Sequence, residues 1–337
     1  MALFQEFQRK NMDPLKEVWL PQSDYNIGNM EFVIPNSRSK YFFDVSDEYK
    51  VDYDYFSSLA LDKFDAYGLA NNHIFDYGRN GVTDIIDELS KKEIAVFGLK
   101  KKEYDLLKFE IKGISFAIIG CVKNGRWISK DPYSPNEYDP IAIVEKIKDL
   151  KQKIDHVFVY PHIGTELVDV PKPEDVEILR GFIDAGATAV VGHHPHIVQG
   201  IEKYKKGIIA YSLGSFVYLP SFEVGYSKEQ GDNRDFSFCL NMTFDKEQLI
   251  EHSVYNYKLD HKKLIPIQYQ EENNYFDKLN TYIDDPSIYS SKVRNNLFKR
   301  ELISFFQRLR KNPIKTIKHY AMYLKIKHLK MLLDRRG

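Results

Sequence analysis

The sequence has 337 residues, a mass of 39.5 kDa and 48 basic against 48 acidic side chains, so its formal net charge is zero. Hydrophobic residues make up 43% and aromatic residues 14% of it, which excludes a chain that is disordered throughout, because such chains have few apolar residues and a high net charge. Two cysteines, Cys121 and Cys239, are too few for a disulfide framework and lack the spacing of a zinc-binding motif.

No segment approaches the roughly 18 to 20 consecutive apolar residues that a transmembrane helix needs. Residues 1–16 are polar and lack the apolar stretch of a secretory signal peptide. We therefore expect a soluble, cytoplasmic protein, with a peripheral contact to the membrane as an open alternative.

Short β-branched runs alternate with amphipathic segments over the first 220 residues. Runs bounded by glycine or charge predict buried strands at 114–120, 156–160, 187–192 and 207–214. Helical periodicity predicts helices at 81–93, 141–153 and 173–186. The last of these begins at Pro173 and ends at Gly186, which are typical first and last residues of a helix. Alternating strands and helices predict an α/β domain.

Residues 292–337 differ in charge from the rest of the chain. They contain fourteen Lys and Arg residues and two acidic residues, Glu301 and Asp334. From residue 299 onward the segment has helical periodicity, interrupted near Pro313. We predict a domain of residues 1–245 and a C-terminal extension of residues 246–337 that is helical and basic from about residue 292.

The basic helices of the extension have two interpretations. Their cations could contact an anionic polymer, an anionic membrane face or a synthase. Alternatively, they pack on the core as a solvated helical layer. A basic segment without a recognised nucleic-acid-binding module does not indicate a nucleic-acid partner.

Five of the ten histidines fall in three short segments, each beside a predicted strand end or a glycine. The segments are LANNHIFDYG (69–78), VFVYPHIGTE (157–166) and VVGHHPHIVQG (190–200). Strand ends are where open α/β sheets assemble ligand sites, so these loops are expected to converge. Imidazole is a common metal ligand, and Asn or carboxylate oxygens suit Mn, Mg or Fe beside it. The alternative for any single histidine is a strand cap or an ordinary hydrogen bond.

Individual positions support this interpretation. In His194-Pro195-His196, the proline favours an extended His194, so the two imidazoles would project to the same side. Asn72 could offer its carbonyl oxygen to a metal while His73 donates a proton, although Asn-Asn also favours a simple turn. Asp76 could orient His73 or cap the following helix. Glu166 could lie behind the metal ligands or in a polar loop.

Together with SDYNIGNMEFVI (23–34) and AYSLGSF (210–216), these strings resemble the CapA family of poly-γ-glutamate and capsule synthesis proteins. That family is similar to a branch of the calcineurin-like metallophosphoesterases. The resemblance covers about Gln22 to Tyr218. It implies a four-layer αββα sandwich of the metallophosphoesterase type, with loops at one end that hold up to two divalent metal ions.

Site residues follow from the resemblance by position. It implies that the metal ligands are Glu31, Asn72, His162, His194 and His196. It implies that His73 is the proton donor, and we place Asp76 with it as a catalytic group. Groups expected near the substrate or behind the ligands are Asn29, Asn71, Glu166, His193 and Ser215.

Two departures from the family pattern bear on the metal. Members usually begin with a strand bearing a G-D motif that supplies a metal carboxylate, and the residues before Asn29 contain no such strand. Ser215 stands where the family usually has Asn. A one-metal site, a degenerate site and a missing natural start remain open; we favour one ion of Mn, Zn or Fe over two.

The resemblance implies a role in capsule or poly-γ-glutamate biosynthesis. The main hypothesis is a metal-dependent hydrolase of a phosphoester or a glutamyl amide bond, with an anionic polymer or a phosphorylated or peptide substrate. One alternative is a non-catalytic capsule-assembly component with a degenerate site. Another is a metal-dependent peptide epimerase on the same scaffold.

Overall fold

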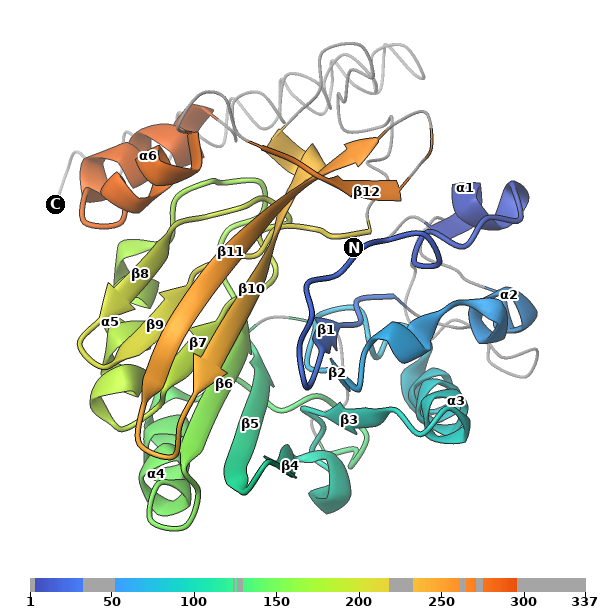
Figure 1. Cartoon of the computed structure of the whole chain (residues 1–337), viewed down its shortest axis with the longest axis horizontal. Helices are drawn as coiled ribbons and strands as arrows, with labels where there is room; N and C mark the ends of the chain where they lie inside the picture. Colours follow the sequence, from blue (N-terminus) through green and yellow to red (C-terminus); the bar gives the residue numbers. More distant parts are fainter. Residues whose placement is uncertain are drawn as a thin grey trace, which may run out of the picture.

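The computed structural model describes residues 4–32, 52–123, 125, 130–217, 233–260, 263, 265–270 and 275–295 of the chain. These residues form two layers of β-sheet between two layers of helices (Figure 1). Within them, no helix combines the length and the apolar character that crossing a membrane requires.

The first β layer is a six-stranded mixed sheet. Its strands follow the order β4 (Leu106–Ile111), β5 (Ile114–Val122), β6 (His156–His162), β7 (Ala189–Val191), β9 (Gly207–Ala210) and β8 (Ile201–Tyr204). The four central strands run parallel, and β4 and β8 pair antiparallel at the two edges. Parallel neighbours need crossover connections, which α4 (Pro140–Leu150) and α5 (Pro173–Asp184) provide on one face of the sheet (Figure 1).

The second β layer consists of two three-stranded sheets. One is parallel and contains β1 (Ile27–Asn29), β2 (Ala66–Gly68) and β3 (Ala95–Phe97). The other is antiparallel and contains β10 (Phe236–Phe244), β11 (Leu249–Asp260) and β12 (Ile265–Gln268). Both lie over the same face of the six-stranded sheet.

Apolar side chains of the six-stranded sheet point alternately to its two faces. On β5, Phe116 and Ile118 face the second β layer, whereas Ala117 and Ile119 face α4 and α5. Successive side chains of a strand point to opposite faces, so one apolar run can supply two cores.

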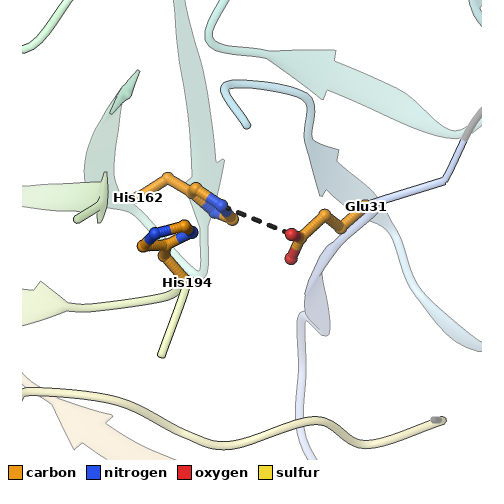
Figure 2. A group of neighbouring side chains, drawn as sticks. All are labelled: Glu31, His162 and His194. Carbon is orange, nitrogen blue, oxygen red and sulfur yellow. Dashed lines mark ion pairs between the residues drawn. The ribbon is translucent and has the colours of Figure 1, made fainter. Parts of the chain in front are cut away.

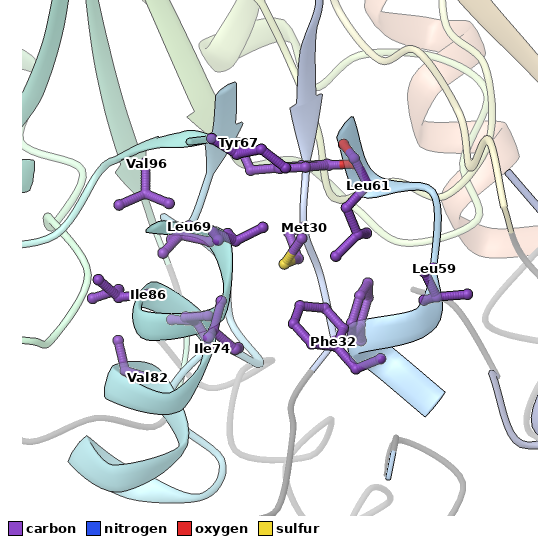
Figure 3. Close-up of a cluster of buried hydrophobic side chains, with 14 of the residues drawn as sticks. Met30, Phe32, Leu59, Leu61, Tyr67, Leu69, Ile74, Val82, Ile86 and Val96 are labelled. Carbon is purple, nitrogen blue, oxygen red and sulfur yellow. The ribbon is translucent and has the colours of Figure 1, made fainter. Parts of the chain in front are cut away.

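The outer helical layer covers the parallel sheet. It contains α2 (Tyr53–Ser58) and α3 (Gly78–Lys91), which pack on Leu69 and Val96 (Figure 3). Other helical segments among the described residues are α1 (Phe4–Arg9), α6 (Tyr275–Thr281), residues 286–295, and short 3-10 turns at Leu61–Lys63, Lys102–Tyr104 and Asn233–Asp235. The layer order is therefore helix, sheet, sheet, helix, which confirms the predicted αββα sandwich.

The predicted elements differ from the observed ones mainly at their ends. Helix α3 begins three residues earlier than predicted, at Gly78, and the predicted strand 207–214 ends at Ala210. Beyond it, Leu213 and Gly214 leave the sheet and form single bridges to Val198 and Ser237. Strands β10, β11 and β12 were not predicted, although apolar and polar residues alternate in FSFCLNMTF.

The predicted boundary at residue 245 falls in the turn between β10 and β11. These strands pair along their length, from Phe236 with Lys258 to Phe244 with Leu249. Residues 246–260 therefore belong to the sandwich and not to a separate extension. The helical, basic segment predicted from about residue 292 lies almost wholly outside the described residues.

At Gly192, directly after β7, the chain comes very close to the backbone at the end of β9. A Cβ atom on Gly192 would lie 2.2 Å from the carbonyl oxygen of Tyr211, and the Gly192 amide donates to the carbonyl of Ala210 at 2.7 Å. Backbone cannot move aside as a flexible side chain can, so this position requires glycine. The histidines at 193, 194 and 196 follow it directly.

We therefore predict that Gly192→Ala lowers the free energy of unfolding by about 1–3 kcal/mol or more, because the added methyl group overpacks the β7–β9 contact. Urea unfolding followed by circular dichroism measures this change. Gly181→Ala is the matched control: it lies in α5 with open space around its Cβ, and alanine there should raise stability by up to about 1 kcal/mol. Equal effects of the two substitutions would contradict the role given to Gly192.

Candidate metal centre

The predicted site residues lie where parallel strands of both β layers end. Glu31 follows β1, and Asn72 and His73 follow β2. His162 is the last residue of β6, and the His193–His196 loop follows β7. Because β1 and β2 are parallel, as are β6 and β7, the site is built at the carboxyl ends of strands from two sheets.

Glu31 is the point at which the two β layers meet. It is buried, and its Oε1 lies 3.5 Å from Nε2 of His162 (Figure 2). The same oxygen lies 3.3 Å from Nε2 of His196. Two ligand atoms bound to one ion at about 2.0–2.2 Å lie roughly 3–3.6 Å apart. Asn29 donates from Nδ2 to Oε2 of Glu31 at 3.4 Å, which orients the carboxylate.

Asn72 and His162 face each other across the site. Nε2 of His162 lies 2.8 Å from Oδ1 of Asn72. The Nδ1 atom of His162 is buried and has no hydrogen-bond partner among the described residues. Glu31 and Asn72 thus contact the His162 ring at Nε2, which is the side on which the resemblance implies a metal.

The two other predicted histidine ligands complete the group. The ring centroids of His162 and His194 are 4.9 Å apart, and those of His194 and His196 are 6.1 Å apart. Ligand atoms of Glu31, His162 and His194 all lie within 4.8 Å of one another (Figure 2). Oγ of Ser215 lies 3.1 Å from Nδ1 of His196, so it fixes that ring with Nε2 toward Glu31.

The backbone of the histidine loop differs from the prediction. Pro195 was expected to hold His194 extended, but φ is +103° at His194 and +58° at His196. Such values are rare for residues other than glycine and persist only where surrounding contacts enforce them. Backbone bonds from the His193 amide to Pro161 and from the Ile163 amide to His193 hold this loop against the end of β6.

His73 and Asp76 form a pair, as one of the two alternatives for Asp76 predicted. Nδ1 of His73 lies 2.8 Å from Oδ2 of Asp76, which is buried, whereas 16% of the His73 side chain is exposed. Helix α3 has Tyr77 at its N-cap and no side-chain cap, so Asp76 orients His73 instead of capping.

Asn71 links the two loops of the parallel sheet. Its Oδ1 accepts from the His73 amide at 3.1 Å, and its Nδ2 donates to the Met30 carbonyl at 2.6 Å. His193 packs on Tyr160, with ring centroids 4.2 Å apart, and it also lines the adjoining cavity.

Glu166 belongs to a second group of potential ligands. Its carboxylate lies with nitrogens of His194 and His196, and the three ligand atoms are within 4.8 Å of one another. The sequence left Glu166 either behind the ligands or in a polar loop, and the structure places its carboxylate near two imidazoles.

Burial keeps the imidazoles neutral. It lowers the pKa of His193 to about 3 and of His194 to about 4, and it also lowers the pKa of His162 and His196. A metal binds the neutral form, so protons do not compete for these nitrogens at neutral pH. The buried Glu31 carboxylate, the Asn72 amide oxygen and the neutral imidazoles therefore fit a divalent metal.

The site adjoins a cavity of about 470 Å³. Glu31, His193, His194 and His196 line one part of it, and most of its remaining wall is apolar, from residues of β1, β6 and β10. The cavity gives a ligand room to reach the imidazoles.

Sequence reasoning missed a contribution from residues after 280. The hydroxyl groups of Tyr289 and Thr165 lie 2.9 Å apart, and Nζ of Lys292 lies 2.7 Å from Oδ2 of Asp169. Both contacts brace the loop that bears Glu166. No local pattern in the sequence indicates them, because they join segments more than a hundred residues apart.

A family model described as bacterial capsule synthesis protein PGA_cap matches residues 7–219. The chain belongs to this family. It is 30% identical to the PGA biosynthesis protein CapA of Bacillus subtilis over 203 residues, which are 58% of this chain and 53% of that protein. It is 29% identical to the capsule biosynthesis protein CapA of Bacillus anthracis over 212 residues, 59% of this chain and 52% of that protein.

The chain thus spans about half the length of these curated CapA relatives. Membership confirms the resemblance inferred from the ANNH, H-x-G-x-E and GHHPH strings. Among solved structures, a phosphatase of Mycoplasma pneumoniae matches with a TM-score of 0.41 at 14% identity, over 78% of this chain and 88% of that one.

The lowered histidine pKa values predict that the metal-free protein loses stability in acid. An unfolded histidine titrates near 6.5, so the unfolded chain gains protons between about pH 6.5 and 4 that His194, with a pKa of about 4, does not. The free energy of unfolding should therefore fall as pH is lowered through this window, by up to about 1.4 kcal/mol per pH unit for each such histidine.

Urea unfolding with a chelator present, repeated at several pH values, measures this slope. His194→Asn should reduce the slope by up to one proton, whereas His252→Asn, on β11 away from the site, should leave it unchanged. Stability that is constant from pH 6.5 to 4 would contradict the buried, neutral state of these rings.

Proposed function

We propose that this protein is a metal-dependent hydrolase in capsule or poly-γ-glutamate biosynthesis, and that it cleaves a phosphoester or a glutamyl amide bond. The observation that supports this most is the convergence of Glu31, His162 and His194 from three separate strand ends to within 4.8 Å. A group of buried carboxylate and neutral imidazoles has little structural use without a cation, because burying a carboxylate costs free energy unless it is paired.

One divalent ion is the proposed resident cofactor. Glu31, Asn72, His162 and His194 would hold it, and this mixture of imidazole nitrogen and oxygen donors suits Mn, Zn or Fe. When bound, such an ion lowers the pKa of a bound water toward neutrality and polarises the scissile bond.

His73 is the proposed general acid. The bond from Nδ1 to Asp76 fixes the ring and leaves Nε2 to donate a proton to the leaving group. The 16% exposure of His73 allows contact with a substrate, in contrast to the buried His162. General acid catalysis of this kind contributes on the order of 10²–10⁴ in rate.

The substrate and setting are also proposals. The names of the CapA relatives point to a poly-γ-glutamate or capsule polymer, so we propose an anionic polymer or a phosphorylated or peptide precursor as substrate. We further propose a cytoplasmic location, with the basic residues after 292 in contact with a synthase or the membrane surface. Lys292 itself pairs with Asp169 and would not take part.

Substitutions should distinguish the proposed metal ligands from the proposed general acid. We predict that His162→Ala removes both bound metal and hydrolysis, because this ring contacts both Glu31 and Asn72. His73→Ala should retain metal and lower kcat by about 10²-fold or more. Metal content by elemental analysis and turnover of model phosphoester and γ-glutamyl substrates are the two measurements.

His252→Ala serves as the control and should change neither quantity, since His252 lies on β11 outside the site. Equal loss of metal in the His73 and His162 variants would contradict the assigned roles. Less than about a tenth of an equivalent of metal in protein purified with Mn or Zn would favour a non-catalytic assembly role. Proton–deuterium exchange at a substrate α-carbon without cleavage would favour an epimerase.

A further inference from the structure

Two helices near the C-terminal end of the described chain, α6 and residues 286–295, pack beside the loops of the candidate metal centre. The second helix begins at Pro286, directly after Asp285, whose Oδ1 accepts from the amide of Ser287 at 2.9 Å. Tyr289 and Lys292 are three residues apart, so they lie on the same side of this helix. Both side chains contact the loop that follows β6.

These two contacts fasten the Glu166 loop, residues 163–169, to the helix. The hydroxyl groups of Tyr289 and Thr165 lie 2.9 Å apart, and Nζ of Lys292 lies 2.7 Å from Oδ2 of Asp169. The Asp169 side chain is 6% exposed, whereas that of Lys292 is 38% exposed. A carboxylate buried to this extent is costly without a cation, so Lys292 ties the loop to the helix.

The Glu166 loop is in turn bonded to the histidine loop at two points. The amide of Ile163 donates to the carbonyl of His193 at 3.0 Å. The amide of Leu167 donates to the carbonyl of Pro195 at 2.8 Å. His194 lies between the two accepting residues, so a displacement of the Glu166 loop would be passed on to the His194 backbone.

Helix α6 holds the other end of the histidine loop. It lies beside β8, the strand that follows this loop (Figure 1). A Cβ atom on Gly200 would lie 2.8 Å from Cδ1 of Ile283, directly after the helix. The amide of Ile201 donates to Oδ1 of Asn280 in α6 at 2.8 Å. The two C-terminal helices therefore contact the chain on both sides of the histidines.

The position of His194 depends on such contacts. Its φ of +103° is unfavourable for a residue with a side chain and persists only where the surroundings enforce it. A ligand atom of His194 lies within 4.8 Å of those of Glu31 and His162. Because a metal ion requires its ligand atoms at about 2.0–2.2 Å, groups that orient a ligand contribute to the affinity for the ion.

We propose that Tyr289 and Lys292 are positioning residues of the metal centre. Through the Glu166 loop they hold His194 in place, and they thereby set the affinity for the ion of the proposed function. The proposal rests on the proposed function for that ion. The effect of the two residues on the Glu166 loop does not require a bound ion, so it can also be measured in the metal-free protein.

The first test is a titration of the metal-free, full-length protein with Mn²⁺, followed by calorimetry. Lys292→Met should weaken Mn²⁺ binding about tenfold, the lower end of the 10- to 100-fold that groups behind metal ligands contribute. Lys292→Arg, which keeps a cation beside Asp169, should restore most of the affinity. Tyr289→Phe removes only a hydroxyl group and should weaken binding by a smaller factor.

Lys91→Met is the matched control. Lys91 also pairs with a buried carboxylate, since its Nζ lies 3.1 Å from Oε2 of Glu88, whose side chain is 8% exposed. It is the last residue of α3, at the end of that helix distant from Asp76. Its substitution should leave the affinity for Mn²⁺ unchanged. Thermal melts of all variants separate a loss of folding from a loss of affinity.

Hydrogen–deuterium exchange of the metal-free protein is the second test. Lys292→Met should speed exchange at the amides of Ile163 and Leu167, which donate to the histidine loop, and Lys91→Met should not. Wild-type affinity for Mn²⁺ in Lys292→Met would overturn this proposal, with or without faster exchange, and would leave the proposed function intact. Absence of any bound Mn²⁺, Zn²⁺ or Fe²⁺ in the wild type would overturn both.

Discussion

A buried carboxylate between two buried imidazoles determines much of how this sandwich is arranged. Glu31 comes from the end of β1 in one β layer, and His162 and His196 come from the other layer. A carboxylate that is 6% exposed is costly unless donors or cations compensate it. The two imidazoles reach the Glu31 carboxylate only when the two β layers pack at the observed spacing. The packing of the fold and the geometry of the site therefore depend on the same contact.

The packing that creates this contact needs small residues near the strand ends. Gly192 brings the exit of β7 against the backbone after β9, and Gly164 brings the loop after β6 against Pro195. A larger residue at either position would displace a loop that carries candidate metal ligands. The left-handed backbone of His194 and His196 lies in the same crowded region, where the histidine loop is bonded to Pro161 of β6 through His193 and to Leu167 through Pro195.

The C-terminal part of the described chain contributes both to the fold and to the site. Residues 246–268 complete the antiparallel sheet, and Tyr289 and Lys292 reach the loop of Glu166. What the sequence suggested to be an appendage is partly structural support for the site.

The sequence alone determined the alternation of strands and helices, the location of histidines at strand ends and the family. These follow from local patterns, since alternation in ISFAIIG (114–120) and the capping signals at Pro173 depend only on neighbouring residues. It also indicated that Asp76 could orient His73, because three residues separate them. The tertiary structure alone decided that Ser215 fixes His196, that Glu166 lies beside two imidazoles, and that β10 and β11 pair across the predicted boundary. Each of those contacts joins segments whose distance is set by the packing of two sheets and their loops, and sequence spacing does not encode that packing.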